Sequence, residues 1–205
     1  MPAISTYAGL LPLIVADLSN CPENLVIQAL REAARQFCLD TEAWIVTQAS
    51  QNIIADQQNY TIVPTEAADI RRIVEVRINT EDGVANGREG ELQRPDDYHF
   101  DQPQTLVLHK YIVPRVSIAG ALDVKVALAP YIISPETELD WSGFFAVWAM
   151  ALCNHARMSL LLKPTRVWSN KELGVYFKAL YDRDVGRAKA EIERRYTGMT
   201  PSVEA

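Results

Sequence analysis

The sequence has few of the residues that build metal and redox sites. Its 205 residues include only three cysteines and three histidines. The cysteines, Cys21, Cys38 and Cys153, are odd in number and widely spaced, and none belongs to a C-x-x-C pair. This pattern argues against a disulfide scaffold and against a zinc knuckle, and it favours a protein made in a reducing compartment.

Common motifs of catalysis and nucleotide binding are also missing. The sequence has no G-x-S-x-G and no H-E-x-x-H, and its glycine-rich stretch "GVANGREG" fits neither the P-loop nor the dinucleotide pattern. Cys153 and His155 lie two positions apart in a predicted helix, so their side chains point in different directions. We therefore expect structural roles for both, with no catalytic site, no metal site, no cofactor and no enzymatic activity.

Long apolar segments are lacking as well. The apolar run near the start, Leu10 to Val15, is interrupted by Pro12 and is far too short to cross a bilayer. No basic residue precedes this run, so it does not have the pattern of a signal peptide. We interpret residues 1–21 as an apolar N-terminal arm, and we expect no membrane association.

Positive charge is scarce outside the C-terminal part of the chain. Residues 1–162 contain 11 Lys and Arg against 20 Asp and Glu, whereas residues 163–196 contain 9 against 5. An acidic body repels phosphates, which disfavours tight, sequence-blind binding of DNA. The basic segment is suited instead to an acidic partner.

Three stretches have the periodicity of amphipathic helices. In residues 22–48, apolar side chains recur every four positions. A second helix is predicted for residues 134–163, where aromatic side chains gather on one face. A third is predicted for residues 169–196 and begins with a capping box made by Ser169 and Glu172.

Between the helices the period changes to two. Residues 58–130 contain the short runs "NYTIVP", "RRIVEVRI", "TLVLHKY" and "ALDVKVALAP", which are rich in strand-forming residues. We predict an antiparallel sheet whose most exposed loop contains Gly83, Gly87 and Gly90. The predicted fold class is α+β, a helical bundle of three main helices with an inserted small antiparallel β-sheet element. It forms a single domain over residues 22–197.

Two acidic clusters are the remaining candidates for cation binding. Glu136, Glu138 and Asp140 stand at the start of a predicted helix, where carboxylates complement the helix dipole. The segment "PDDYHFD", which includes Asp97, has too few ligands for an EF-hand loop. We interpret the first cluster as a helix start and the second as a solvated turn.

The order of these parts resembles a head-to-tail adaptor (connector) protein of tailed bacteriophages. Three stretches are similar to that family. The opening "CPENLVIQALREAARQFCLDTEAW" has an alanine-rich helix face, a Phe-Cys pair and a later Trp. The stretch "VKVALAPYIISPETELDWSGFFAVWAMALCNHARMSLLLKPTRVWSN" has a strand ending in proline, a long helix, and then a proline and a tryptophan before the next cap. The closing "ELGVYFKALYDRDVGRAKAE" begins with aromatic residues.

The resemblance implies a structural protein in the neck of a virion, made in the host cytoplasm. The family forms a homo-oligomeric ring, commonly a 12-mer, beneath the portal protein. The ring extends the DNA channel to the tail, so double-stranded DNA passes through it during ejection without sequence-specific binding. Its other neighbour is a downstream neck or tail protein.

The resemblance also implies which segments meet these neighbours. The family's C-terminal arm docks onto the portal, and in this chain that arm is residues 198–205. The candidate portal contacts are Met199, Pro201 and Val203. The candidate tail-facing residues, in the loop of the β insertion, are Gly83, Gly87, Arg88 and Gly90.

Two alternatives remain open from the sequence. A neck stopper or tail-completion protein belongs to the same structural class and differs only in its neighbour. A small metal-dependent hydrolase belongs to a different class and would use His155, Cys153 or the acidic cluster near Asp97.

Overall fold

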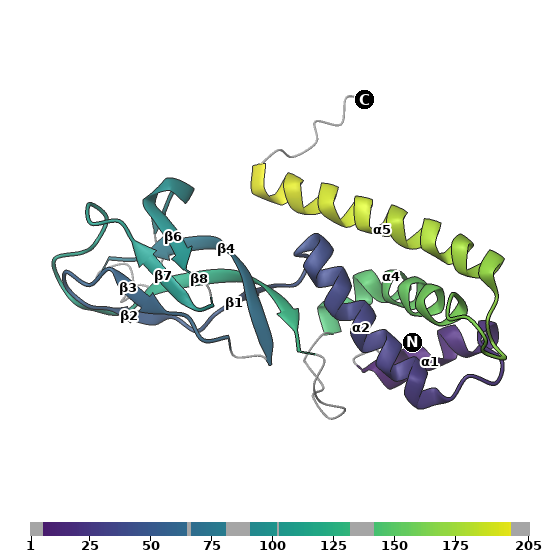
Figure 1. Cartoon of the computed structure of the whole chain (residues 1–205). Coiled ribbons are helices and arrows are strands. Elements are labelled where there is room, and N and C mark those ends of the chain that lie inside the picture. The colour runs from purple at the N-terminus through teal and green to yellow at the C-terminus, as the bar shows by residue number, and fades with distance from the viewer. Residues whose placement is uncertain (1–5, 65–66, 81–90, 102, 132–141, 198–205) are drawn as a thin grey trace. The chain divides into compact units, whose positions relative to one another are not determined.

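The chain folds into two compact units, seen in the computed structural model (Figure 1). One unit contains residues 1–43 and 130–205 and is helical; the other contains residues 44–129 and is built of strands. The predicted single domain over residues 22–197 therefore includes parts of both units. The structure describes residues 6–64, 67–80, 91–101, 103–131 and 142–197.

Aromatic side chains from three helices form the centre of the helical unit. Phe37 of α2 lies with its ring centroid 5.3 Å from that of Trp148 in α4 and 6.2 Å from that of Tyr181 in α5. Such tilted and edge-on ring pairs contribute about 0.5–1.5 kcal/mol beyond the area they bury. The helices of this unit are α1 (Tyr7–Ile14), α2 (Glu23–Thr41), α4 (Ser142–Leu161) and α5 (Lys171–Thr197).

The N-terminal segment is part of this core, so the prediction of an arm over residues 1–21 is wrong for its described part. Thr6 caps α1 by accepting a hydrogen bond from the amide of Gly9, and a 3-10 turn, Val15–Asp17, follows the helix. Leu10 and Ile14 are fully buried. The apolar run Leu10 to Val15 packs against other helices. Pro12 within the run does not prevent this packing.

The predicted helix 22–48 is too long. Helix α2 ends at Thr41, and Glu42 follows it in the left-handed conformation with φ of 54°. The amide of Glu42 donates to the carbonyl of Cys38, which closes the helix in the way a C-terminal glycine usually does. The chain then enters strand β1 (Ile45–Thr47). The apolar spacing of four residues continues past Thr41 into β1. For this reason the helix end predicted from the sequence, residue 48, lies too late in the chain.

The start of α5 differs from the predicted capping box. Asn170, not Ser169, caps the helix, because its Oδ1 accepts a hydrogen bond of 3.1 Å from the amide of Leu173. The hydroxyl of Ser169 instead accepts from the amide of Arg166 and donates to the carbonyl of Lys163. Ser169 therefore stabilises the turn that joins α4 to α5.

The β unit contains two antiparallel sheets. In the larger sheet the strand order is β1-β8-β4-β5, and β2 also pairs with β8. The smaller sheet has the order β3-β7-β6. The remaining strands are β2 (Gln51–Ile53), β3 (Asn59–Thr61), β4 (Ala68–Ile78), β5 (Glu91–Leu92), β6 (Tyr98–Asp101), β7 (Thr105–Leu108) and β8 (Ile118–Pro130).

Strand β8 pairs with both β1 and β2, and its pairing with β2 is interrupted by a shift in register. Ile45 and Gln51 lie opposite Ala127 and Leu122, but the register shifts before Ile53. Gly120 lies at this shift with φ of 61°, and its amide donates to Asn52 Oδ1 at 2.9 Å. A glycine is required there because other residues rarely adopt a positive φ.

The predicted fold class, a bundle of three main helices with an inserted small antiparallel β-sheet element, is wrong. The described residues form four helices and eight strands in two antiparallel sheets, with a curled half-barrel sheet. Four predicted runs overlap the strands β3, β4, β7 and β8. Strand β1 lies in the segment predicted as a helix, and β6 lies in the segment interpreted as a solvated turn. Strands β2 and β5 are only three and two residues long and belong to no run of strand-forming residues.

Candidate interaction surface between helices α4 and α5

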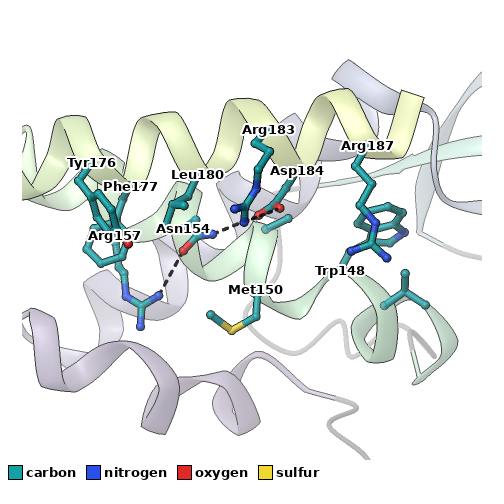
Figure 2. A pocket seen from close by; sticks show the side chains of 12 residues that line it. Trp148, Met150, Asn154, Arg157, Tyr176, Phe177, Leu180, Arg183, Asp184 and Arg187 are labelled. Carbon is teal, nitrogen blue, oxygen red and sulfur yellow. Dashed lines mark hydrogen bonds and ion pairs between the residues drawn. The ribbon is translucent and has the colours of Figure 1, made fainter. Parts of the chain in front are cut away.

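A groove of about 490 Å³ lies between α4 and α5 in the helical unit. Figure 2 shows side chains of both helices converging on it. We call it the α4–α5 groove. Its lining residues are Val147, Trp148, Met150, Ala151, Asn154 and Arg157 of α4, and Tyr176, Phe177, Leu180, Arg183, Asp184 and Arg187 of α5.

Arg157 forms the base of the groove at one end and is only 7% exposed. Its Nε lies 2.7 Å from Asp17 Oδ2, and its Nη2 donates to the carbonyl of Leu13. The guanidinium also lies over the ring of Phe177, 4.7 Å from the centroid. A buried guanidinium is costly unless it is paired and hydrogen-bonded, and here α1, α4 and α5 all contribute to that pairing.

A chain of polar contacts continues from Arg157 along the groove. Asn154 accepts a long hydrogen bond from Arg157 Nη1 and donates to Asp184 Oδ2 at 3.1 Å (Figure 2). Asp184 Oδ1 in turn lies 3.5 Å from Arg183 Nη2. Because Asn154 and Arg157 are both buried, these contacts fix the spacing between α4 and α5.

Three large side chains on the rim of the groove are about half exposed. Val147 is 54% exposed, Met150 52% and Tyr176 56%. All three are large side chains, and they line one groove instead of being scattered singly over the surface. Clustered exposure of this kind is typical of a surface that binds another protein or a ligand.

The groove also has an excess of positive charge. Three of its lining residues are arginines and one is an aspartate. The guanidinium of Arg187 lies 5.8 Å from the centroid of the Trp148 ring, and the side chain of Arg183 is 70% exposed. Exposed arginine beside aromatic and apolar side chains is common in protein interfaces.

Cys153 and His155 do not line the groove. Burial raises the pKa of the Cys153 thiol to about 11, which makes it a poor nucleophile. The ring of His155 lies 4.7 Å from that of Tyr181, and burial lowers its pKa, against the opposing influence of Asp40 and Glu32. Among the residues that the structure describes, the buried Nδ1 atom of His155 has no hydrogen-bond partner.

The acidic turn near Asp97 lies in the β unit. Asp97 accepts hydrogen bonds from the hydroxyl of Tyr111 at 2.7 Å and from the amide of Arg94 at 2.8 Å, and the bond from Tyr111 lowers its pKa. The ring centroids of His99 and His109 lie 5.7 Å apart. Within the described part of the chain, no three His, Cys, Asp or Glu residues are grouped to hold a metal ion.

Several predicted site residues lie outside the described residues. They are the candidate portal contacts Met199, Pro201 and Val203, the candidate tail-facing residues Gly83, Gly87, Arg88 and Gly90, and the acidic cluster Glu136, Glu138 and Asp140. Their placement stays a prediction.

The groove was not found from the sequence, although a signal for it exists. Val147, Met150, Asn154 and Arg157 are three or four positions apart, as are Tyr176, Leu180, Arg183 and Arg187. Each set forms a second stripe beside the apolar core stripe of its helix. A mixed stripe of arginine, methionine and tyrosine resembles a solvated flank until the facing helix is known.

Comparisons with known proteins give no family for this chain. No protein-family model matches the sequence, and a search of curated proteins finds no significant relative. Across the residues that the structure describes, no helix has both the length and the apolar character to span a membrane.

Proposed function

We propose that this protein is a head-to-tail adaptor of a tailed bacteriophage, a structural component of the virion neck. Its copies form a ring, twelvefold in the usual arrangement, between the portal protein and a downstream neck or tail protein. The ring extends the DNA channel, and the protein acts by holding its neighbours together and not by catalysis. The order of sequence motifs supports this proposal.

The structural observation that supports it best is the α4–α5 groove. Val147, Met150 and Tyr176 are each about half exposed and lie together on this groove. A side chain such as these contributes about 1.5–3 kcal/mol when it is fully buried, so the groove gives a partner protein a substantial gain on binding. An assembly protein needs such a surface.

The charge distribution is consistent with a DNA conduit. Residues 1–162 have a net charge of −9. If these residues line the bore, they repel the phosphates of the passing duplex, and no ion pairs form that would hold it in place. The assembled ring is therefore expected to have a negative potential along its bore and to bind duplex DNA weakly at all salt concentrations.

The proposal is tested by measuring the mass of the protein alone and mixed with a portal protein. Size-exclusion chromatography with light scattering should show a complex that contains the portal and one ring of this protein. Removing residues 198–205 should abolish portal binding and leave the helical content unchanged. A full-length chain that stays monomeric and does not bind the portal would contradict the proposal. Binding to a tail component in place of the portal would instead indicate a stopper.

A further inference from the structure

A second pocket, of about 220 Å³, lies beside the turn that joins α4 to α5, residues 162–170. We call it the turn pocket. Val167 and Trp168 line it from the turn, and Asn20 lines it from the segment after α1. We propose that the turn pocket and the basic side chains of the turn bind an acidic peptide segment of a partner protein. The inference does not depend on the proposed ring, because it concerns a different surface from the α4–α5 groove.

Trp168 has a hydrogen-bond donor that no described residue satisfies. Its Nε1 atom is buried, and among the residues that the structure describes it has no acceptor. An indole N–H can only donate, and a buried donor without an acceptor costs free energy. A ligand in the turn pocket that offers a carbonyl or carboxylate oxygen would recover this cost. The donor therefore favours a ligand with such oxygens, which every acidic peptide has.

The turn and the start of α5 are positively charged. Lys163, Arg166 and Lys171 are exposed, and none of them has a carboxylate partner within the described parts of the chain. Residues 162–173 contain these three basic side chains and one acidic side chain, Glu172, which gives a net charge of +2. A ligand that covers this surface is therefore favoured by carboxylates and disfavoured by basic groups.

The carboxylate that lines the turn pocket does not cancel this charge. Asp17 Oδ2 lies 2.7 Å from Arg157 Nε, so the charges of these two side chains compensate each other. The other polar residues that line the pocket are serines and asparagines, which carry no charge. The surroundings of the pocket therefore stay positive.

Val167 adds an apolar contact at the edge of the turn pocket. Its side chain is 84% exposed, although it lies next to the largely covered Trp168. Thr165, two residues earlier, has φ of 63°, a conformation that β-branched residues rarely adopt. Strained residues of this kind occur often at binding sites. An exposed apolar side chain beside tryptophan and arginine is typical of the centre of a protein interface.

Nucleic acid is the other class of ligand that basic side chains attract, and the turn is less suited to it. Proteins bind single strands by stacking bases on aromatic rings. The guanidinium of Arg166 already lies over the ring of Trp168, 5.9 Å from the centroid. Binding through phosphates alone needs many cations, whereas this surface has a net charge of only +2. The exposed Val167 also favours a peptide, because it offers nothing to a phosphate.

The NMR signal of the Trp168 indole N–H tests the inference directly. The probe is a synthetic peptide in which glutamate alternates with leucine, titrated into the isotope-labelled full chain. Trp168→Phe identifies the signal as the one that disappears. The acidic peptide should move this signal downfield, because the N–H gains an acceptor, and a peptide with lysine in place of glutamate should not. No shift with the acidic peptide, or an equal shift with both peptides, would overturn the inference.

Charge reversal shows whether binding occurs at the turn. Arg166→Glu should lower the affinity for the acidic peptide about tenfold, because attraction is replaced by repulsion. Lys189→Glu is the matched control, since it makes the same change of charge on an exposed side chain about 27 Å along α5 from Lys171. Its affinity should stay within about twofold of the wild type. Equal losses in the two variants would mean that only net charge attracts the peptide, and the inference would fail.

A second pair of variants tests the apolar contact. Val167→Ser should lower the affinity for the same peptide about threefold, because the leucines of the peptide lose an apolar partner. Val175→Ser is the control, since Val175 is 54% exposed in α5 but lies outside the turn pocket. Circular dichroism melts verify that every variant folds. Wild-type affinity of Val167→Ser, or an equal loss in its control, would contradict a contact at Val167.

Two other occupants are outcomes of the same NMR measurement. A duplex DNA oligonucleotide that moves the Trp168 signal at a lower concentration than the acidic peptide would identify a nucleic-acid surface. A Trp168 signal that moves as the concentration of the protein alone is raised would identify a second copy of this chain as the occupant. Either result would overturn the inference, whereas a shift caused by the acidic peptide alone supports it.

Discussion

Arg157 contacts three other segments of the helical unit. It pairs with Asp17, hydrogen-bonds the carbonyl of Leu13 and lies on the ring of Phe177. It therefore ties the N-terminal helix to α4 and α5 at once. A sequence can show that an arginine lies on a helix flank, but it cannot show that a carboxylate 140 positions earlier compensates it.

Replacing this side chain should be strongly destabilising. In Arg157→Leu, the Leu13 carbonyl and the partly exposed Asp17 lose their partner, and leaving such a polar group unsatisfied costs about 1–3 kcal/mol. Thermal and urea unfolding of the helical unit measures the loss. Arg166→Leu is the control, because Arg166 is exposed and only lies over Trp168. Equal stability of the two variants would show that the Arg157 contacts are not needed for the fold.

The buried His155 should make stability depend on pH. Burial lowers its pKa below the unfolded value of about 6.5, so below that pH the unfolded chain binds more protons than the folded chain. Its contribution is complete above about pH 6.5 and is lost as the pH falls toward the lowered pKa. Urea titrations between pH 7.5 and 5.5 should show a larger loss for the wild type than for His155→Gln. Parallel curves for the two proteins would contradict this role.

Helix α5 shows how position decides the effect of a glycine. A Cβ at Gly174 would lie 2.7 Å from Leu162 Cδ2, whereas a Cβ at Gly186 would meet nothing within 4 Å. Gly174 therefore lets the turn after α4 fold back onto α5. Gly186 has no such role and only makes the helix more flexible.

Replacement by alanine should stabilise the helical unit at Gly186 but not at Gly174. Gly186→Ala should stabilise the helical unit by about 0.5–1 kcal/mol, because alanine loses less entropy in a helix. Gly174→Ala should give no such gain, since Leu162 has to rotate away from its contact. The measurement is the thermal unfolding midpoint of each variant. A gain of the same size at both positions would show that the close approach to Leu162 has no energetic weight.

The type of most long elements was predictable from the sequence, but their ends and the short elements were not. The stripes of α4 and α5 and the alternation in β4 and β8 are strong enough to predict. The end of α2 depends on Glu42 adopting a left-handed conformation, which a glutamate rarely does. The helix α1 is not predictable from the sequence, because its burial comes from tertiary contacts with α2 and α4.

At the scale of the whole molecule, the β unit joins the helical unit through two connections near its first and last residues. Ile45 and Ala127 are paired in the larger sheet, so the two ends of the β unit are adjacent. The unit has its own fully buried side chains, among them Leu106, Leu108 and Leu122. A unit with adjacent ends and a separate core is expected to fold alone.

Residues 44–129, expressed alone, should therefore form the same β structure. Circular dichroism and a dispersed amide spectrum would establish it, and the full chain should then unfold in two transitions. An excised unit that is unfolded, together with a single transition for the full chain, would show that the two units depend on each other.

The candidate site was less predictable than the fold, because it depends on how two helices pack against each other. The α4–α5 groove exists only because two stripes, on helices separated by the turn at residues 162–170, face each other. Neither stripe is apolar enough to identify alone. The contact candidates predicted instead, in the loop and the C-terminal arm, came from a family resemblance and not from side-chain chemistry.

One measurement tests the central claim most directly: electron microscopy of the purified protein mixed with portal protein. A head-to-tail adaptor is expected to form a closed ring of copies on one face of the portal, coaxial with its channel. Single, unassembled molecules beside bare portals would contradict it.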